Sequence, residues 1–148
     1  MVTGVQTCAL PISALIPFGI TGTALRPVFH MSGFLGSATP IFEIREAGGP
    51  ATDMLIRDRK LGAALARALG AAPFALMRGH GSVAVGATLK QVVFRAIYAE
   101  VNARLQSEAL RLGAINYLND AEAANAARTN DSVIDRPWDL WLARAARP

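Results

Sequence analysis

The residues best suited to chemistry lie in one short stretch, Arg78-Gly79-His80-Gly81, where a guanidinium and an imidazole stand two positions apart among glycines. Histidine changes charge near neutral pH and is a common metal ligand. Arginine binds a carboxylate or phosphate through two parallel hydrogen bonds. Glycine lets the backbone turn sharply where a side chain must be aimed. A lone histidine between glycines is more often a turn residue than a ligand, so both interpretations stay open at this point.

Two short apolar runs must position this stretch. Phe74–Met77 precedes it and 82–85 follows it, and both predict brief buried strands. Thr88 is a plausible N-cap for the longest predicted helix, 89–112, and Gly113 ends that helix. The histidine is therefore expected at the edge of a sheet, in the turn between two strands.

The RGHG sequence, the apolar run after it and the helix VFRAIYAEVNARLQ together resemble the C-terminal half of the class II aldolase/adducin family, including its sugar-aldolase-like and decarboxylase-like members. The similarity runs from about Ser13 to the C-terminus. It implies an α/β fold, a three-layer αβα sandwich with a mixed or largely antiparallel sheet. It also implies that His80 is the third of three imidazoles that hold a divalent metal, usually zinc, with manganese as the alternative. Such enzymes usually form homotetramers with active sites between subunits.

Residues 2–12, VTGVQTCALPI, resemble a translated sequencing-library adapter read in frame. We therefore expect residues 1–12 to be non-native and residues 13–148 to form a partial domain, truncated at its N-terminus. In the family members that this chain resembles, a His-x-His precedes a segment like SALIPFG, which places those two ligands at Ala9 and Pro11. Two of the three expected histidine ligands are then absent, and so is the family's acidic residue further upstream.

Two further candidate site residues, Arg26 and His30, lie in the sequence LRPVFHM. Pro27 suits the first turn of a helix, and the apolar residues after it share one face of that helix: Val28, Met31 and Leu35. The plain interpretation is the start of a surface helix. The resemblance to the decarboxylase-like and sugar-aldolase-like members instead implies a pocket in which Arg26, His30 and Arg78 bind the substrate.

The rest of the chain alternates strands with helices, which is typical of a layered α/β domain. Periodicity and capping residues predict a strand at 40–44 and helices at 59–69, 120–128 and 135–144. Gly70 should end the first of these helices, and Asp120 should cap the second. We expect the two tryptophans of the last helix to pack against the body of the protein or a neighbouring subunit.

The composition excludes several classes of protein. With 148 residues, 52% of them hydrophobic and 18% charged, the chain suits one globular domain. The basic residues that give a net charge of +4 are scattered, so we expect no nucleic-acid partner. The chain has no apolar run of about 18 residues and no signal-peptide pattern, so we expect a cytoplasmic protein without a membrane segment. One cysteine, Cys8, excludes an internal disulfide.

The leading functional hypothesis is a fragment of a divalent-metal-dependent aldehyde-lyase of carbohydrate metabolism. It would cleave a carbon–carbon bond in a small sugar-phosphate-like or hydroxy-acid substrate. One alternative is a decarboxylase-like member acting on an aromatic carboxylate, and the other is a non-catalytic, adducin-like binding domain. Because His80 is the one family ligand present, we expect the chain by itself to be inactive. We also expect it to be poorly stable, since the missing N-terminal part would leave sheet edges and core uncovered.

Overall fold

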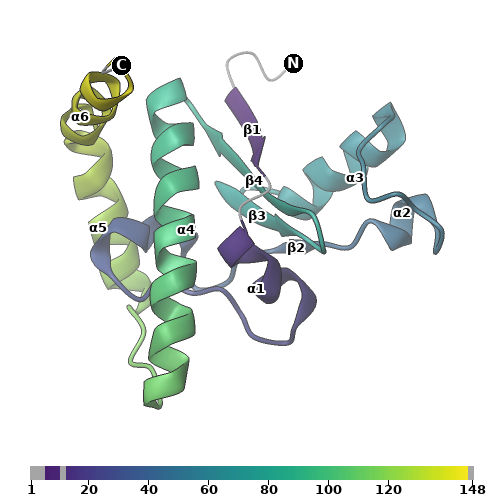
Figure 1. The fold of residues 1–148 in the computed structure, drawn as a ribbon, viewed down its shortest axis with the longest axis horizontal. Helices are drawn as coiled ribbons and strands as arrows, with labels where there is room; N and C mark the ends of the chain where they lie inside the picture. The colour runs from purple at the N-terminus through teal and green to yellow at the C-terminus, as the bar shows by residue number, and fades with distance from the viewer. Residues whose placement is uncertain (1–5, 11–12, 147–148) are drawn as a thin grey trace.

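A four-stranded mixed sheet forms the centre of the fold (Figure 1). The structure, a computed structural model, describes residues 6–10 and 13–146. The strands lie in the order β1-β4-β3-β2. Their bounds are Gln6–Leu10 for β1, Ile41–Phe42 for β2, Phe74–Met77 for β3 and Gly81–Gly86 for β4. Strand β4 runs antiparallel to both β1 and β3, whereas β2 runs parallel to β3, so the predicted mixed sheet is confirmed.

Side chains of β3 alternate between two cores on opposite faces of the sheet, as the two-residue period of a strand requires. Phe74 and Leu76 enter the first core, and Ala75 and Met77 enter the second. The first core is completed by Leu15, Phe18, Leu25, Leu35, Ala84, Val92, Ala99 and Ala103. The second core is completed by Phe42, Ile44, Leu61 and Val83. Because both faces of β3 are buried, its sequence is a continuous apolar run.

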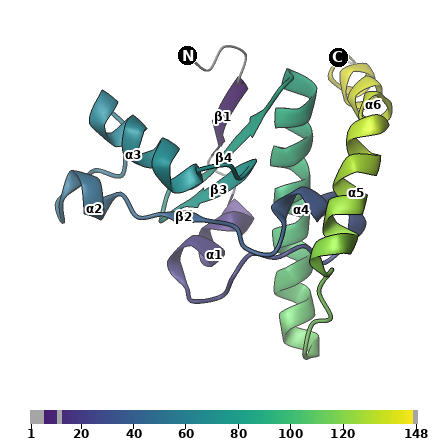
Figure 2. The same ribbon diagram turned by 180° about the vertical axis from the view of Figure 1, so that it is seen from behind.

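Helices cover the sheet on both sides, which gives the three layers predicted from the sequence (Figures 1 and 2). The short helices η1 (Ser13–Leu15) and α1 (Ile16–Ile20) and the long α4 (Leu89–Leu112) lie over the first core. The second core lies under α2 (Arg45–Gly48) and α3 (Arg59–Leu69).

The two C-terminal helices do not extend the sheet layers. Helix α5 (Asp120–Ser132) packs on the 3₁₀ helix η2 (His30–Leu35), and α6 (Asp135–Ala145) packs on α4. Trp141 of α6 lies against Phe94 and Tyr98, with ring centroids 6.5 and 6.1 Å away, which confirms packing of this tryptophan against the body. Within the described residues, no helix is both long enough and apolar enough to span a bilayer.

The helices next to the hairpin have the predicted bounds. Helix α3 begins after Asp58, whose carboxylate accepts a hydrogen bond from the Leu61 amide at 2.8 Å, and ends at Gly70, where φ is +57°. Helix α4 begins after Thr88, whose hydroxyl accepts from the Gln91 amide at 3.2 Å. These caps satisfy amides that have no partner inside the helix.

Three local predictions are wrong. The helix expected from Pro27 is absent: the chain is extended up to Phe29, because buried side chains of α4 take up its backbone hydrogen bonds, and η2 begins only at His30. The strand expected over 40–44 stops at Phe42, because the backbone after it winds into α2. Helix α5 is capped by Asn119 in a reciprocal pair with Glu122, not by Asp120, and it continues to Ser132.

Candidate functional site around His80

His80 lies at the end of a tight turn between β3 and β4. Its amide donates to the Met77 carbonyl at 3.0 Å, which closes a four-residue turn. The third residue of that turn, Gly79, has a φ of +66°, as type II turns require. A residue with a Cβ would be strained there, so the glycine predicted to aim the histidine has this role.

The His80 side chain lines an open pocket of about 520 Å³ on the α3 side of the sheet. Of the residues whose side chains are described, those that line it with His80 are Leu55, Ile56, Arg57, Leu65, Met77 and Val83. The walls are therefore mostly aliphatic, with one imidazole and one guanidinium as the polar groups. Such a lining suits a flat, largely apolar ligand that carries a negative charge.

Arg57 was not singled out by the sequence. Its Nε lies 2.5 Å from Oδ2 of Asp53, four residues earlier, and both side chains are exposed. The hydrogen bond from Arg57 holds the pKa of the Asp53 carboxyl below its usual range. Arg57 reaches the pocket because residues 52–58 cross over the β3–β4 turn, with Met54 on the turn itself. This contact joins residues far apart in sequence, and no local pattern marks it.

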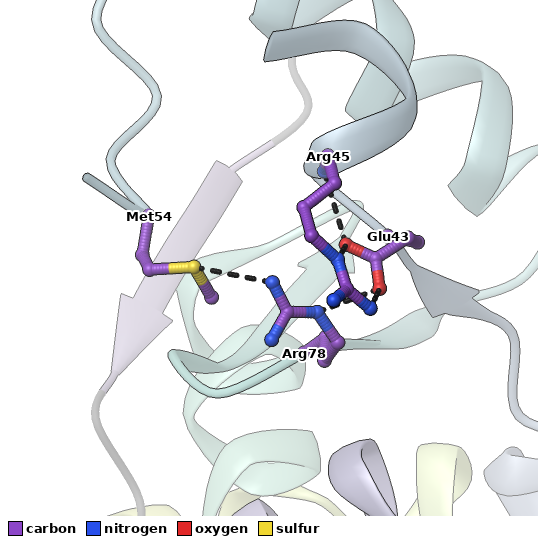
Figure 3. A network of polar contacts seen from close by, with 4 residues as sticks. All are labelled: Glu43, Arg45, Met54 and Arg78. Atoms are coloured by element: carbon purple, nitrogen blue, oxygen red, sulfur yellow. Dashed lines mark hydrogen bonds and ion pairs between the residues drawn. The ribbon is translucent and has the colours of Figure 1, made fainter. Parts of the chain in front are cut away.

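Arg78, the other charged residue of the turn, is engaged with Glu43 (Figure 3). Arg78 Nε lies 2.6 Å from Glu43 Oε2 in an ion pair. Arg45 also binds this carboxylate, with its Nε 3.0 Å from Oε1 and its Nη2 2.7 Å from Oε2. Hydrogen bonds from Arg45, and next from Arg78, lower the pKa of Glu43 to about 2. The carboxylate therefore stays ionised throughout the neutral range.

Arg26 and His30 lie elsewhere in the fold. The Arg26 guanidinium stacks over the Tyr117 ring, 4.2 Å from its centroid. His30 is exposed at the start of η2, and its carbonyl accepts from the Asn130 side chain at 2.8 Å. Neither is among the described residues that line the His80 pocket. The structure thus brings Arg78 and His80 together in one turn, while substrate binding by Arg26, His30 and Arg78 stays a prediction.

The described residues do not form a complete metal site. Among them, no three His, Cys, Asp or Glu side chains lie close enough to hold an ion. His80 alone falls short of the convergent donor set that zinc requires. In the sheet, Ala9 lies opposite Val83, close in register to the histidine turn, whereas Pro11 is outside the described residues. We therefore derive no chemical step through a metal ion.

Comparison with known proteins agrees with this architecture. Residues 7–107 match the family model described as the Class II Aldolase and Adducin N-terminal domain. The chain belongs to the class II aldolase and adducin family. Two curated relatives of this chain are decarboxylases: decarboxylase tropJ of Talaromyces stipitatus and 3,4-dihydroxyphthalate decarboxylase of a Terrabacter species.

The first of these relatives is 35% identical over 88% of this chain and 57% of its own length. The second is 28% identical over 68% of this chain and 41% of its own length. The chain thus spans about half the length of the curated relatives that it matches.

Solved structures show the same family fold. An L-fuculose 1-phosphate aldolase superposes with a TM-score of 0.66 at 17% identity, over 86% of this chain and 55% of the aldolase. An aldolase II superfamily protein from Pseudomonas syringae gives 0.65 at 15% identity, over 95% of this chain and 54% of that protein. At these identities the likeness establishes the class II aldolase fold and leaves the reaction to the site.

Proposed function

We propose that this chain is part of a carbon–carbon lyase that decarboxylates an aromatic carboxylate. The observation that carries the proposal is the 35% identity to decarboxylase tropJ along 88% of the chain. The second relative, named for 3,4-dihydroxyphthalate, points to the same class of reaction. The sequence alone favours aldol cleavage, whereas these relatives favour decarboxylation.

The pocket supports an aromatic acid as the ligand. An aromatic ring could lie between the aliphatic walls made by Ile56, Leu65 and Val83. A carboxylate on that ring would be held by the planar guanidinium of Arg57, in exchange for its exposed contact with Asp53. A sugar phosphate has many hydroxyl groups, and these aliphatic walls would leave them without hydrogen-bond partners.

Aldol cleavage remains the second candidate, because both reactions break a carbon–carbon bond and leave an electron pair on carbon that must be stabilised. A divalent zinc or manganese ion, a homotetramer and a cytoplasmic location stay predictions for the whole protein. An adducin-like binding role would follow if neither reaction occurs.

The proposal is tested with the double variant Ala9→His/Pro11→His, which returns histidines to the positions implied by the family resemblance. The variant is loaded with zinc or manganese and incubated with 3,4-dihydroxyphthalate or with fuculose 1-phosphate. The family's acidic residue is still missing from this variant, so we expect slow release of carbon dioxide from the aromatic acid and no aldol cleavage. The same double variant with His80→Ala is the matched control and should be inactive. Aldol cleavage of the sugar phosphate without decarboxylation would overturn the proposal.

A further inference from the structure

We propose that Glu43 and Met54 are positioning residues for His80, holding the 77–80 turn from two sides so that the imidazole keeps its place in the pocket wall. Neither residue lines that pocket. The inference rests on the proposed function only in taking His80 as the functional imidazole. Its test measures the turn itself, and so does not depend on whether the lyase activity is found.

The first contact is electrostatic and comes from the end of β2. Glu43 follows Phe42, whose carbonyl accepts from the Arg78 amide at 3.1 Å, so the backbone already joins β2 to the turn. The Glu43–Arg78 ion pair at 2.6 Å adds a second link one residue further on. Both side chains are only about a quarter exposed, at 23% and 25%. Arg45 binds both oxygens of the same carboxylate, so Glu43 cannot easily rotate away from Arg78 (Figure 3).

The second contact comes from Met54, which lies over the turn. Its sulfur accepts from Arg78 Nη2 at 3.4 Å, and a Cβ built on Gly79 would lie 3.1 Å from its terminal methyl carbon. Met54 is thus in contact with two of the four residues of the turn. Glycine at 79 suits the positive φ of this position, and it also lets Met54 approach the turn without having to shift.

Met54 is also the one non-glycine residue among those described that has a positive φ, at +70°. The left-handed conformation is sterically unfavourable for a residue that has a Cβ. Such strain persists where surrounding contacts over-determine the backbone, and it is frequent at functional sites. Here the strained backbone directs the methionine side chain onto the turn, while the residues after it, Leu55 to Arg57, form the pocket wall.

The ion pair between Glu43 and Arg78 is tested with Glu43→Gln, which keeps the shape of the side chain and removes its charge. Glu100→Gln is the matched control, because Glu100 also pairs with an arginine, Arg104 at 2.7 Å, but on α4. Hydrogen exchange is followed at the His80 amide, bonded to Met77, and at the Val85 amide, bonded to Pro73. In Glu43→Gln we expect about tenfold faster exchange at His80 and little change at Val85. The control should change neither.

The imidazole supplies a readout that general loss of stability would not produce. The chain has two histidines, so the His30 ring is an internal reference for the His80 ring in NMR spectra. Glu43→Gln should shift or broaden the His80 ring signals and leave those of His30 in place. Unchanged His80 signals and exchange, or equal acceleration at His80 and Val85, would overturn the positioning role of Glu43.

The contact of Met54 with the turn is tested with two variants that separate the effect of the side chain from the effect of the backbone strain. Met54→Ala removes the contact and keeps the strain, whereas Met54→Gly removes both. If the side chain positions the turn, both variants should accelerate His80 exchange about equally, although the glycine variant melts at the higher temperature. Faster His80 exchange in only one of the two variants, or in neither, would show that the methionine contact does not hold the turn.

Discussion

His80 is one imidazole in a turn, and strand β1 lies beside the strand that follows this turn. Ala9 lies opposite Val83 and Leu10 lies opposite Ser82, two residues beyond His80. The family resemblance places the two missing histidines at 9 and 11. The register thus brings position 9, which the resemblance assigns to a ligand, to the end of the sheet at which the His80 turn lies.

We predict that the chain binds zinc weakly and that Ala9→His/Pro11→His binds it stoichiometrically at micromolar concentration. Three convergent imidazoles should reach a dissociation constant below about 1 μM, whereas one cannot. Calorimetric titration with zinc measures this. Adding His80→Ala to the double variant should abolish the gain, and adding His30→Ala should leave it. Tight zinc binding by the unaltered chain would contradict the prediction.

Glu43 gives a second prediction at the scale of single residues. Arg45 and Arg78 lower its pKa from 4.5 to about 2, so the folded chain binds this proton less tightly than the unfolded chain. The resulting stabilisation is fully present above pH 4.5 and is lost as the pH falls from about 4.5 towards 2.

Chemical denaturation of the wild-type chain and of Glu43→Gln across this pH range measures the effect. The difference in free energy of unfolding between the two proteins should be constant near neutral pH and should shrink below pH 4.5. A difference that stays constant down to pH 3 would show that the carboxylate contributes no charge-dependent stability.

Among the elements, helix α4 covers the first core and also binds the backbone of residues 24–28 through its polar side chains. Its buried Asn102 accepts from the Val28 amide at 2.9 Å and donates to the Arg26 carbonyl at 2.8 Å. One turn later, Gln106 accepts from the Arg26 amide at 3.0 Å and donates to the Ala24 carbonyl at 2.7 Å. These side-chain amides, together with the Leu118 amide that donates to the Pro27 carbonyl, provide partners for the backbone of a segment outside the sheet.

We therefore predict that Asn102→Leu and Gln106→Leu each lower the free energy of unfolding by about 2–4 kcal/mol, since each leaves two backbone groups unpaired. Arg104→Ala lies on the exposed side of the same helix and should change it by less than about 0.5 kcal/mol. Denaturant unfolding measures all three. If the leucine variants leave the free energy of unfolding nearly unchanged, water must provide the hydrogen-bond partners for these backbone groups instead.

The same helix shows why some elements could be predicted from the sequence and others could not. Local signals define α3 and α4: both have a capping side chain and a terminal glycine, and α3 has an apolar period as well. The segment 24–29 contains a proline that suits a helix start, yet side chains more than 70 positions away hold it extended. Asn119 and Asp120 are equally good caps by type, and the local pairing of Asn119 with Glu122 three residues later decides between them.

At the scale of the whole molecule, the two faces of the sheet differ. The core under α3 opens into the His80 pocket, and residues of the other core do not line that pocket. The histidine turn could be predicted because glycines and a short strand mark it locally. Arg57 could not, since it reaches the pocket only when residues 52–58 fold over the β3–β4 turn.

This difference between the two faces predicts which ligand the chain binds more tightly, even without a metal. An aromatic dicarboxylate should perturb the His80 ring signals, because its ring fits the aliphatic walls and one carboxylate reaches Arg57. A sugar phosphate at the same concentration should perturb them far less. Arg57→Gln should weaken the aromatic ligand about tenfold, which corresponds to about 1.4 kcal/mol. Arg26→Gln, on the other side of the sheet, should leave its affinity unchanged if the pocket is the whole binding site. Weaker binding in the Arg26 variant would instead support the substrate role that the sequence predicted for that residue, and would place the ligand outside the α3 face.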